Sequence, residues 1–385
     1  MFDLVLRNGR VIDPANGRDD AADVAFSSGK VAAVGPSLSG THERDVSGCL
    51  VIPGNIDFHT HVYWGGTSIS IDADALARRA GTTTWLDVGS AGPGNFAGFR
   101  KHVMEHSQTR ILAYLHVGHA GIFAFSPTVM VGESLDLRLM DTANCAAVAR
   151  ANADLIRGIK VRVGANTSGV NGIAPLFHAL EAADRAGLPV MCHIDRPPPR
   201  YTDVLAELRP GDTLTHCFKP FPNAPCTAAG QVKEACWEAR ERGVLFDIGH
   251  GAGSFDFGVA EAMLKAGFPP DIISSDVHVL CIDGPAFDNR ETMSKFLMLG
   301  MDLPEIVRAV TQTPAKALAR PDLGNFSIGS AGDATIMRIE EGRFTFTDVM
   351  GQTREGRQRF ALDSVVVGGA VWHEVNPSQQ SLAAD

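Results

Sequence analysis

The sequence lacks the features of several classes of protein. Among its 385 residues, Lys and Arg number 34 and Asp and Glu number 44, so the formal net charge is −10. A chain short of positive charge is poorly matched to a nucleic-acid backbone, which proteins bind largely through Lys and Arg. No run of residues approaches the about 18 uninterrupted apolar positions that indicate a membrane span. We therefore expect no nucleic-acid partner and no membrane partner.

Signals for export are also missing. The seven cysteines are odd in number and contain no C-x-x-C pair, which argues against a disulfide framework or a zinc ribbon. Asp3, Arg7 and Arg10 place charges where a secretory signal would be apolar. Apolar residues make up 45% of the chain and charged residues 20%, a composition that can bury a large core. These features favour a cytoplasmic enzyme that acts on a small-molecule substrate.

The middle of the chain alternates apolar strands with helix-like segments. The helix expected over Leu176–Ala186, for example, follows Pro175 and stops at Gly187. Eight such strand-and-helix units within roughly 250 residues favour a (β/α)8 TIM barrel, with an open doubly wound sheet as the alternative. The eight strand candidates are Ile56–His61, Thr82–Val88, Ile111–Val117, Ile156–Val163, Pro189–Ile194, Thr213–Cys217, Val244–Ile248 and Asp271–Ser275.

Both ends of the chain read as short strands separated by turns. Asn8-Gly9 favours a tight hairpin turn between two apolar runs, and Ser27–Lys30 indicates a second turn. Glycine-punctuated apolar runs return after about residue 320. We predict an α/β protein in which residues 1–53 and 321–385 form a composite β domain, a small β-sandwich. It would lie beside a barrel of residues 54–320.

Polar residues stand at the carboxyl ends of several predicted strands. His59 and His61 end the first strand, His193 the fifth and His216 the sixth, and Asp276 follows the eighth. Residues i and i+2 of a strand point to the same side, and barrel enzymes keep their active sites at this end. Imidazole and carboxylate groups suit a transition metal. A buried structural histidine or a helix-capping aspartate explains any one of them, but explains the whole set poorly.

Lys160 is unusual because it lies in the middle of the apolar strand Ile156–Val163. An unpaired ammonium group would be costly to bury there, so this lysine either pairs with a carboxylate or is modified. Desolvation lowers the pKa of a lysine. The neutral amine could then add CO₂ and give an anionic carbamate able to bridge two metal ions.

Taken together, these residues resemble the amidohydrolase superfamily, and more narrowly its dihydroorotase-like deacetylases. Two histidines after the first strand, a lysine on the fourth, histidines after the fifth and sixth and an aspartate after the eighth carry the resemblance. It extends over nearly the whole chain, through the runs Val51–His61, Gly81–Thr84, Asp87–Gly92, Gly211–Phe218, Thr313–Leu318 and Gly324–Ala334.

The resemblance implies a binuclear metal centre. Its ligands would be His59, His61, Lys160, His193, His216 and Asp276. The cofactors would be two divalent metal ions, with zinc expected for nitrogen and oxygen ligands, bridged by a CO₂-derived carbamate on Lys160 and by a hydroxide. Asp276 would serve as general base and then general acid while the hydroxide attacks an amide or ester carbonyl. The superfamily is also compatible with a homo-oligomer.

The sequence therefore favours a metal-dependent hydrolase that deacetylates a small acylated carboxylate. A cyclic amidase or dipeptidase, similar to dihydroorotase or isoaspartyl dipeptidase, is the alternative. A non-enzymatic scaffold, and an isomerase or decarboxylase, fit the complete ligand set less well.

Substrate contacts are harder to assign from the sequence. Tyr63 occupies the position where a dihydroorotase would be expected to have an arginine for its substrate carboxylate. We predict that Tyr63, Arg162, His250 and His278 contact the substrate. Arg196, just past His193, is a further candidate for an anion contact. Packing or a surface ion pair is the alternative for each.

Overall fold

Seven strands from the middle of the chain form one parallel sheet in the computed structural model, which describes residues 1–375. The strands neighbour one another in chain order, and nearly all of their residues are buried, as is typical of a parallel sheet covered on both faces. These positions confirm seven of the eight predicted strands. They are β6 (Asn55–Thr60), β7 (Thr82–Val88), β8 (Arg110–His116), β9 (Ile156–Val163), β10 (Val190–Ile194), β11 (Thr213–Thr215) and β12 (Leu245–Asp247).

The eighth predicted strand, Asp271–Ser275, forms only isolated bridges. On one side the Ile272 amide donates to the Phe246 carbonyl (3.2 Å), and on the other the Asp276 amide donates to the His59 carbonyl (2.7 Å). Residues 271–277 therefore lie between the two edge strands, β12 and β6. Asp276 has a positive φ of 47°, which β-structure does not accommodate, so the segment cannot continue as a regular strand.

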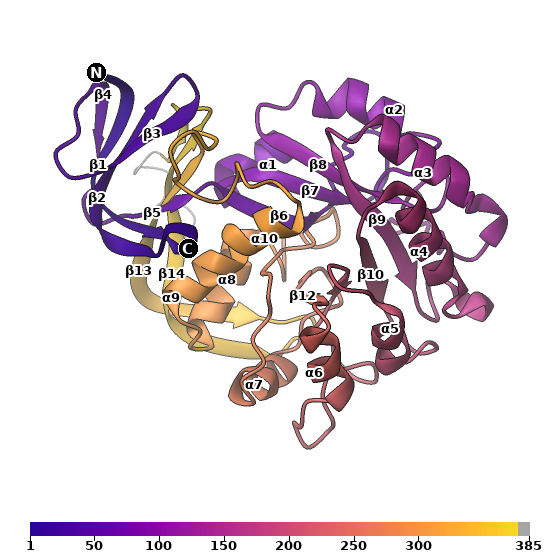
Figure 1. Cartoon of the computed structure of the whole chain (residues 1–385). Coiled ribbons are helices and arrows are strands. Elements are labelled where there is room, and N and C mark those ends of the chain that lie inside the picture. The colour runs from indigo at the N-terminus through magenta and orange to yellow at the C-terminus, as the bar shows by residue number, and fades with distance from the viewer. Residues whose placement is uncertain (376–385) are drawn as a thin grey trace.

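Helices lie outside the parallel sheet (Figure 1). The first begins where Asp72 accepts a hydrogen bond from the Ala75 amide and ends at Gly81 with φ 74°, the capping pattern that the sequence predicts. The helices are α1 (Ala73–Ala80), α2 (Phe96–Phe99), α3 (Thr142–Ala151), α4 (Ala174–Ala186), α5 (Tyr201–Glu207), α6 (Glu234–Glu241), α7 (Phe257–Lys265), α8 (Asn289–Met298), α9 (Leu303–Val310) and α10 (Gln312–Ala317), with short turns η1 (Pro14–Asn16), η2 (Arg100–Met104), η3 (Leu137–Leu139) and η4 (Gly169–Asn171). None of the described helices is long and apolar enough to cross a membrane.

Strands from both ends of the chain form a second, mixed sheet, coloured indigo and yellow in Figure 1. The sheet is branched, because β1 pairs with β4 through its first half and with β5 further along. The ends of the chain thus pair as predicted. The strands are β1 (Phe2–Asp13), β2 (Arg18–Ser27), β3 (Lys30–Gly35), β4 (Gly40–Asp45), β5 (Leu50–Pro53), β13 (Ala334–Thr347), β14 (Thr353–Val367) and β15 (Ala370–Glu374).

The hairpin predicted at Asn8-Gly9 is wrong, because β1 runs straight through these residues. They form a bulge against β2, with Asn8 at φ 65°. A Cβ atom at Gly9 would lie 2.5 Å from a methyl group of Val51, so the close approach of β5 requires glycine here. The second predicted turn is confirmed at Ser28-Gly29, between β2 and β3.

Thr335 joins the two sheets through a buried hydroxyl group. Its Oγ1 donates to the Gly81 carbonyl (2.6 Å) and accepts from the Asn55 amide at the start of β6 (3.1 Å). The side chain is 0% exposed. The start of the parallel sheet and the terminal sheet are therefore held together by buried polar contacts.

We expect Thr335→Val to destabilise the protein by about 1–3 kcal/mol, because the Asn55 amide and the Gly81 carbonyl would stay buried without their partner. The midpoint of chemical denaturation measures the change. Thr353→Val is the matched control, since Thr353 is exposed on β14. Equal midpoints for the two variants would contradict this role of Thr335.

Candidate metal centre

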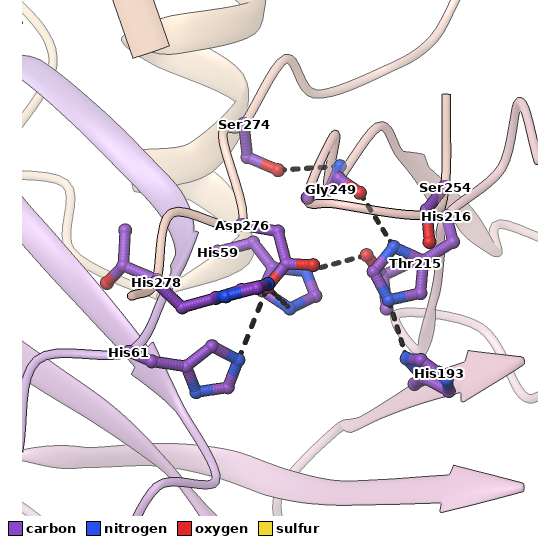
Figure 2. Close-up of polar contacts among 12 residues, drawn as sticks. His59, His61, His193, Thr215, His216, Gly249, Ser254, Ser274, Asp276 and His278 are labelled. Carbon is purple, nitrogen blue, oxygen red and sulfur yellow. Dashed lines mark hydrogen bonds and ion pairs between the residues drawn. The ribbon is translucent and has the colours of Figure 1, made fainter. Parts of the chain in front are cut away.

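His59 of β6, His61 directly after that strand and one aspartate meet in the first part of the site (Figure 2). The Nε2 atoms of His59 and His61 each lie 3.3 Å from Oδ1 of Asp276. All three residues are buried, and their ligand atoms lie within 4.8 Å of one another. The positive φ of Asp276 turns its carboxylate from residues 271–277 toward β6. This group can hold a divalent metal ion.

Hydrogen-bond partners at Nδ1 orient the rings of His59 and His61. Nδ1 of His59 lies 2.7 Å from Oγ1 of Thr215, whose hydroxyl donates to Asp247 at 2.6 Å. Because the hydroxyl proton is used on Asp247, Nδ1 of His59 carries the proton of that contact and Nε2 keeps its lone pair. Nδ1 of His61 similarly lies 2.9 Å from the Ser90 hydroxyl. Both Nε2 atoms therefore face Asp276.

His193 and His216 form the second part of the site. Nδ1 of His216 donates to the Gly249 carbonyl at 2.7 Å, so its Nε2 has a lone pair. That Nε2 lies 2.6 Å from Nδ1 of His193. The His216 ring centroid is 5.1 Å from that of His59, which places the second pair beside the first. Two converging imidazole nitrogens suit a second metal ion.

Lys160 on β9 is 0% exposed, with the carboxylates of Asp276 and Asp247 as the negative charges that act on its ammonium. Its Nζ contacts the Met191 sulfur at 3.4 Å, and within residues 1–375 it forms no ion pair. Burial lowers the pKa of Lys160 to about 8. A sizeable fraction of this amine is therefore neutral near physiological pH.

Burial also shifts the pKa values of His59, His61 and Asp276. It lowers the pKa of His59 well below its ordinary value and that of His61 to about 3. Both imidazoles are thus neutral, the form that binds metal. Burial raises the pKa of Asp276 to about 6, so this carboxyl can accept and return a proton near neutral pH.

All six residues implied as ligands line one cavity of about 620 Å³. Its outer rim is apolar, with Phe125 and Met130 on one loop, Phe221 on another, and Met350 on the turn between β13 and β14. The terminal sheet therefore supplies part of the wall around a site built mainly by the parallel sheet.

Two of the predicted substrate contacts, Arg162 and His278, line this cavity. Nε and Nη2 of Arg162 donate to the two carboxylate oxygens of Glu133 at 2.7 and 3.2 Å, and Arg162 lies over the Phe125 ring. Nδ1 of His278 accepts from the Leu280 amide at 3.2 Å. The neutral His278 ring therefore carries its proton on Nε2.

Tyr63 and His250 are not among the residues that line this cavity, and their substrate contacts stay predictions. The Tyr63 ring stacks on that of Phe99, with the ring centroids 4.6 Å apart. Tyr63 and Trp64 line a separate pocket. The His250 ring stacks on Phe255 at 4.7 Å, and its Nε2 lies 2.8 Å from Nζ of Lys295. Positive φ angles at Gly249 and Gly251 turn the chain away from the alternation of a strand, so His250 points elsewhere.

Other cavity residues escaped the sequence analysis. Thr167, Asp195 and Lys219 line the same cavity as His193 and His216. Lys219 comes three positions after His216, and a lone lysine in the run Phe218–Pro222 is the signal that could have drawn attention to it. Thr167 and Asp195 carry no such signal, because loop polar residues are common.

Curated proteins similar to this chain include two deacetylases. No family model matches the chain. A deacetylase of Agrobacterium fabrum is 35% identical over 344 residues, covering 88% of this chain and 84% of the relative. A deacetylase of Enterococcus faecalis is 31% identical over 377 residues, covering 96% of this chain and 99% of the relative.

Two solved structures are also similar. One is described as an adenine deaminase, with a TM-score of 0.91 and 30% identity, covering 97% of this chain and 100% of that one. Another is described as a dihydroorotase, with a TM-score of 0.88 and 31% identity, covering 97% of this chain and 99% of that one.

We expect Thr215→Val to weaken metal binding by about 10- to 100-fold, because Nδ1 of His59 loses the acceptor that orients it. Competition with a chromogenic chelator measures the affinity. Thr213→Val is the matched control, since Thr213 is equally buried on β11 and its hydroxyl has no partner within the described residues. Unchanged affinity in Thr215→Val would remove this orienting role.

Proposed function

Because this chain belongs to the amidohydrolase superfamily of metal-dependent hydrolases, we propose that it is a deacetylase of small acylated carboxylates. The observation that carries the proposal is the convergence of His59, His61 and Asp276 beside His193 and His216 in one cavity. The identity to two deacetylases, 35% and 31% over most of the chain, supports the acyl group.

The cofactors we propose are two divalent metal ions, with zinc favoured by the nitrogen and oxygen donor set. His59, His61 and Asp276 would hold one ion, and His193 and His216 the other. The neutral fraction of Lys160 would add CO₂ at Nζ with loss of one proton, and the carbamate oxygens would supply the missing negative ligand. When bound, the ions lower the pKa of water and polarise the acyl carbonyl.

Asp276 is the residue we propose for proton transfer. Its carboxylate lies at the centre of the first group, and its raised pKa of about 6 suits an acid and base at neutral pH. It would take the proton from the attacking water and return it to the leaving nitrogen or oxygen. The neutral His278, with a proton on Nε2, lines the same cavity and can donate to a substrate oxygen.

A cyclic amidase is the second candidate, favoured by the likeness to the solved dihydroorotase. Tyr63 weighs against it, because the position expected to hold an arginine carries an aromatic ring that packs on Phe99 outside the cavity.

We also infer a closed barrel as the scaffold. Hydrogen bonds of residues 271–277 to both β12 and β6 support an eighth unit that completes the ring. The branched terminal sheet, with a separate apolar core of its own, supports a two-layered β domain formed by residues 1–53 and 321–375. Residues 376–385 of the predicted range lie outside the described residues.

The experiment that tests the function measures acetate release by zinc-loaded protein. The substrates are matched N-acetyl amino acids and O-acetyl 2-hydroxy acids, each as both enantiomers, with cyclic amides and dipeptides as the alternative series. We expect release from at least one acetylated series. Release from neither, by protein verified to contain metal, would reject the deacetylase, and turnover of a cyclic amide would favour the second candidate.

We expect Lys160→Ala to lose most bound metal, because the buried site would lack its bridging anion. Elemental analysis of the purified variant gives the metal content, and propionate should restore part of the activity by replacing the carbamate. Lys265→Ala on the exposed side of α7 is the control. Full metal content in Lys160→Ala would contradict the proposed carbamate bridge.

We expect Asp276→Asn to retain metal while its kcat falls by about 100- to 10,000-fold, since an amide cannot accept the proton. Steady-state kinetics and metal analysis on the same sample separate the two effects. Asp283→Asn, an exposed neighbour, serves as control. Near-normal turnover in Asp276→Asn would assign the proton transfer to another group.

A further inference from the structure

A buried cation on α8 takes no part in the chemistry proposed above. Lys295 is 0% exposed, does not line the metal-site cavity and forms no ion pair within residues 1–375. A charge that is buried without an ionic partner costs stability. The groups that this ammonium contacts are therefore the guide to its role.

Three hydrogen bonds use every donor of the Lys295 side chain. Nζ donates to Nε2 of His250 at 2.8 Å and to the carbonyls of Pro285 and Thr347, each at 2.7 Å. An ammonium group has three N–H donors, so none is left over. The acceptors lie in the loop after β12, in the loop before α8 and at the end of β13, which makes Lys295 a junction of three segments that are distant in sequence.

The contact between Lys295 and His250 has a defined direction. Nδ1 of His250 donates to the Gly251 carbonyl at 3.0 Å, which leaves the lone pair on Nε2. Burial, assisted by the charge of Lys295, lowers the pKa of His250 well below its ordinary value. Burial also lowers the pKa of Lys295 to about 8, against the opposing charges of Glu291 and Asp348. At neutral pH a charged donor therefore faces a neutral acceptor.

The loop after β12 contacts three of the proposed metal ligands. Nδ1 of His216 donates to the Gly249 carbonyl at 2.7 Å (Figure 2), and a Cβ atom at Gly249 would lie 2.8 Å from Nδ1 of His59. A Cβ atom at Gly251 would overlap the carboxylate of Asp276. A shift of this backbone would therefore displace ligand side chains.

His250 is the side chain by which this loop is held from outside the cavity, because its two neighbours, Gly249 and Gly251, have none. Its ring stacks on Phe255, with the ring centroids 4.7 Å apart, and its Nε2 accepts from Lys295. The stacking holds the ring across its plane, and the hydrogen bond holds it along its plane. The position of the backbone next to the metal ligands thus depends on Lys295.

The third acceptor connects Lys295 to the cavity wall. Thr347 is the last residue of β13, and two positions later the Val349 amide donates to the Phe255 carbonyl at 3.2 Å. Val349 and Met350 line the metal-site cavity. One ammonium group therefore holds both the loop beside the ligands and the turn between β13 and β14.

We propose that Lys295 is a positioning residue that fixes the metal ligands through His250 and the cavity wall through Thr347. A neutral side chain could fill the same space at a lower desolvation cost, but it could not hold three acceptors at once. The inference rests on the proposed function, because it concerns the geometry of the metal centre. It assigns to Lys295 no contact with the reacting atoms.

Metal binding tests the link through His250. Metal-free protein is titrated with Co²⁺, and the visible absorption bands of the bound ion report its affinity and its coordination geometry. We expect Lys295→Met to weaken Co²⁺ binding by about 10-fold and to change the bands. Met293→Ala, buried on the same helix, is the matched control, since it lowers stability through a cavity and leaves the three hydrogen bonds in place.

A double-mutant cycle distinguishes positioning from a general loss of stability. His250→Phe keeps a ring and removes the acceptor, so it cuts the same link from the other end. It should weaken Co²⁺ binding by a similar factor, and Lys295→Met should add little to it. Additive losses from the two substitutions, unchanged binding in both single variants, or equal losses in Lys295→Met and Met293→Ala would overturn the proposal.

Hydrogen exchange of the metal-free protein separates this inference from the proposed function. We expect Lys295→Met to speed amide exchange at residues 249–251 and 347–350 together, and Met293→Ala to affect these two segments no more than the rest of the chain. A wild type that binds no Co²⁺ would reject the metal centre, and the joint change in exchange would still assign the junction to Lys295. Unchanged exchange in both segments would reject Lys295 as their anchor.

Discussion

The site depends on one constraint, which is that three of its four proposed histidine ligands have their Nδ1 atom held by a hydrogen-bond partner outside the cavity. Thr215 holds His59, Ser90 holds His61 and the Gly249 carbonyl holds His216. The remaining nitrogens then have only one direction in which to point, toward the cavity. Because rotation of any ring would break a buried hydrogen bond, the ligand positions are fixed before a metal ion arrives. The parallel sheet places these partners, because Thr215 lies on β11 and Ser90 and Gly249 follow the ends of β7 and β12.

Three buried or half-buried lysines show how the environment decides what the same side chain does. Lys295 donates at 2.7–2.8 Å to His250 and to the carbonyls of Pro285 and Thr347, so it is satisfied and structural. Lys160 has only a sulfur contact, which favours chemical modification. Lys219 lines the cavity, and its Nζ makes two long contacts of 3.4 Å, to the Gly253 carbonyl and the Ser254 hydroxyl. Sequence position alone does not distinguish these cases.

The sequence predicted the strand-end histidines because alternation is a reliable rule inside a strand. It failed where the backbone leaves that geometry. Positive φ angles next to His250 turn that ring toward Lys295, and the bulge at Asn8-Gly9 needs a tertiary contact with Val51 that no local signal reveals. Seven strands of the parallel sheet were recognised from their apolar runs, whereas the eighth segment forms only isolated bridges with its neighbours. Lys219 was missed because its place in the cavity comes from the fold of the loop after His216, which only the three-dimensional structure shows.

The turn between β13 and β14 places Met350 on the cavity rim, anchored by the Val349 amide on the Phe255 carbonyl and by the Phe257 amide on the Asp348 carboxylate. During synthesis from the N-terminus, every proposed metal ligand has been made once residue 276 is added, but the rim is incomplete until residue 350 follows. The nascent chain therefore acquires its metal-binding groups before the entrance narrows. Exchange of this one turn would alter the cavity wall while leaving the sequence of the parallel sheet untouched.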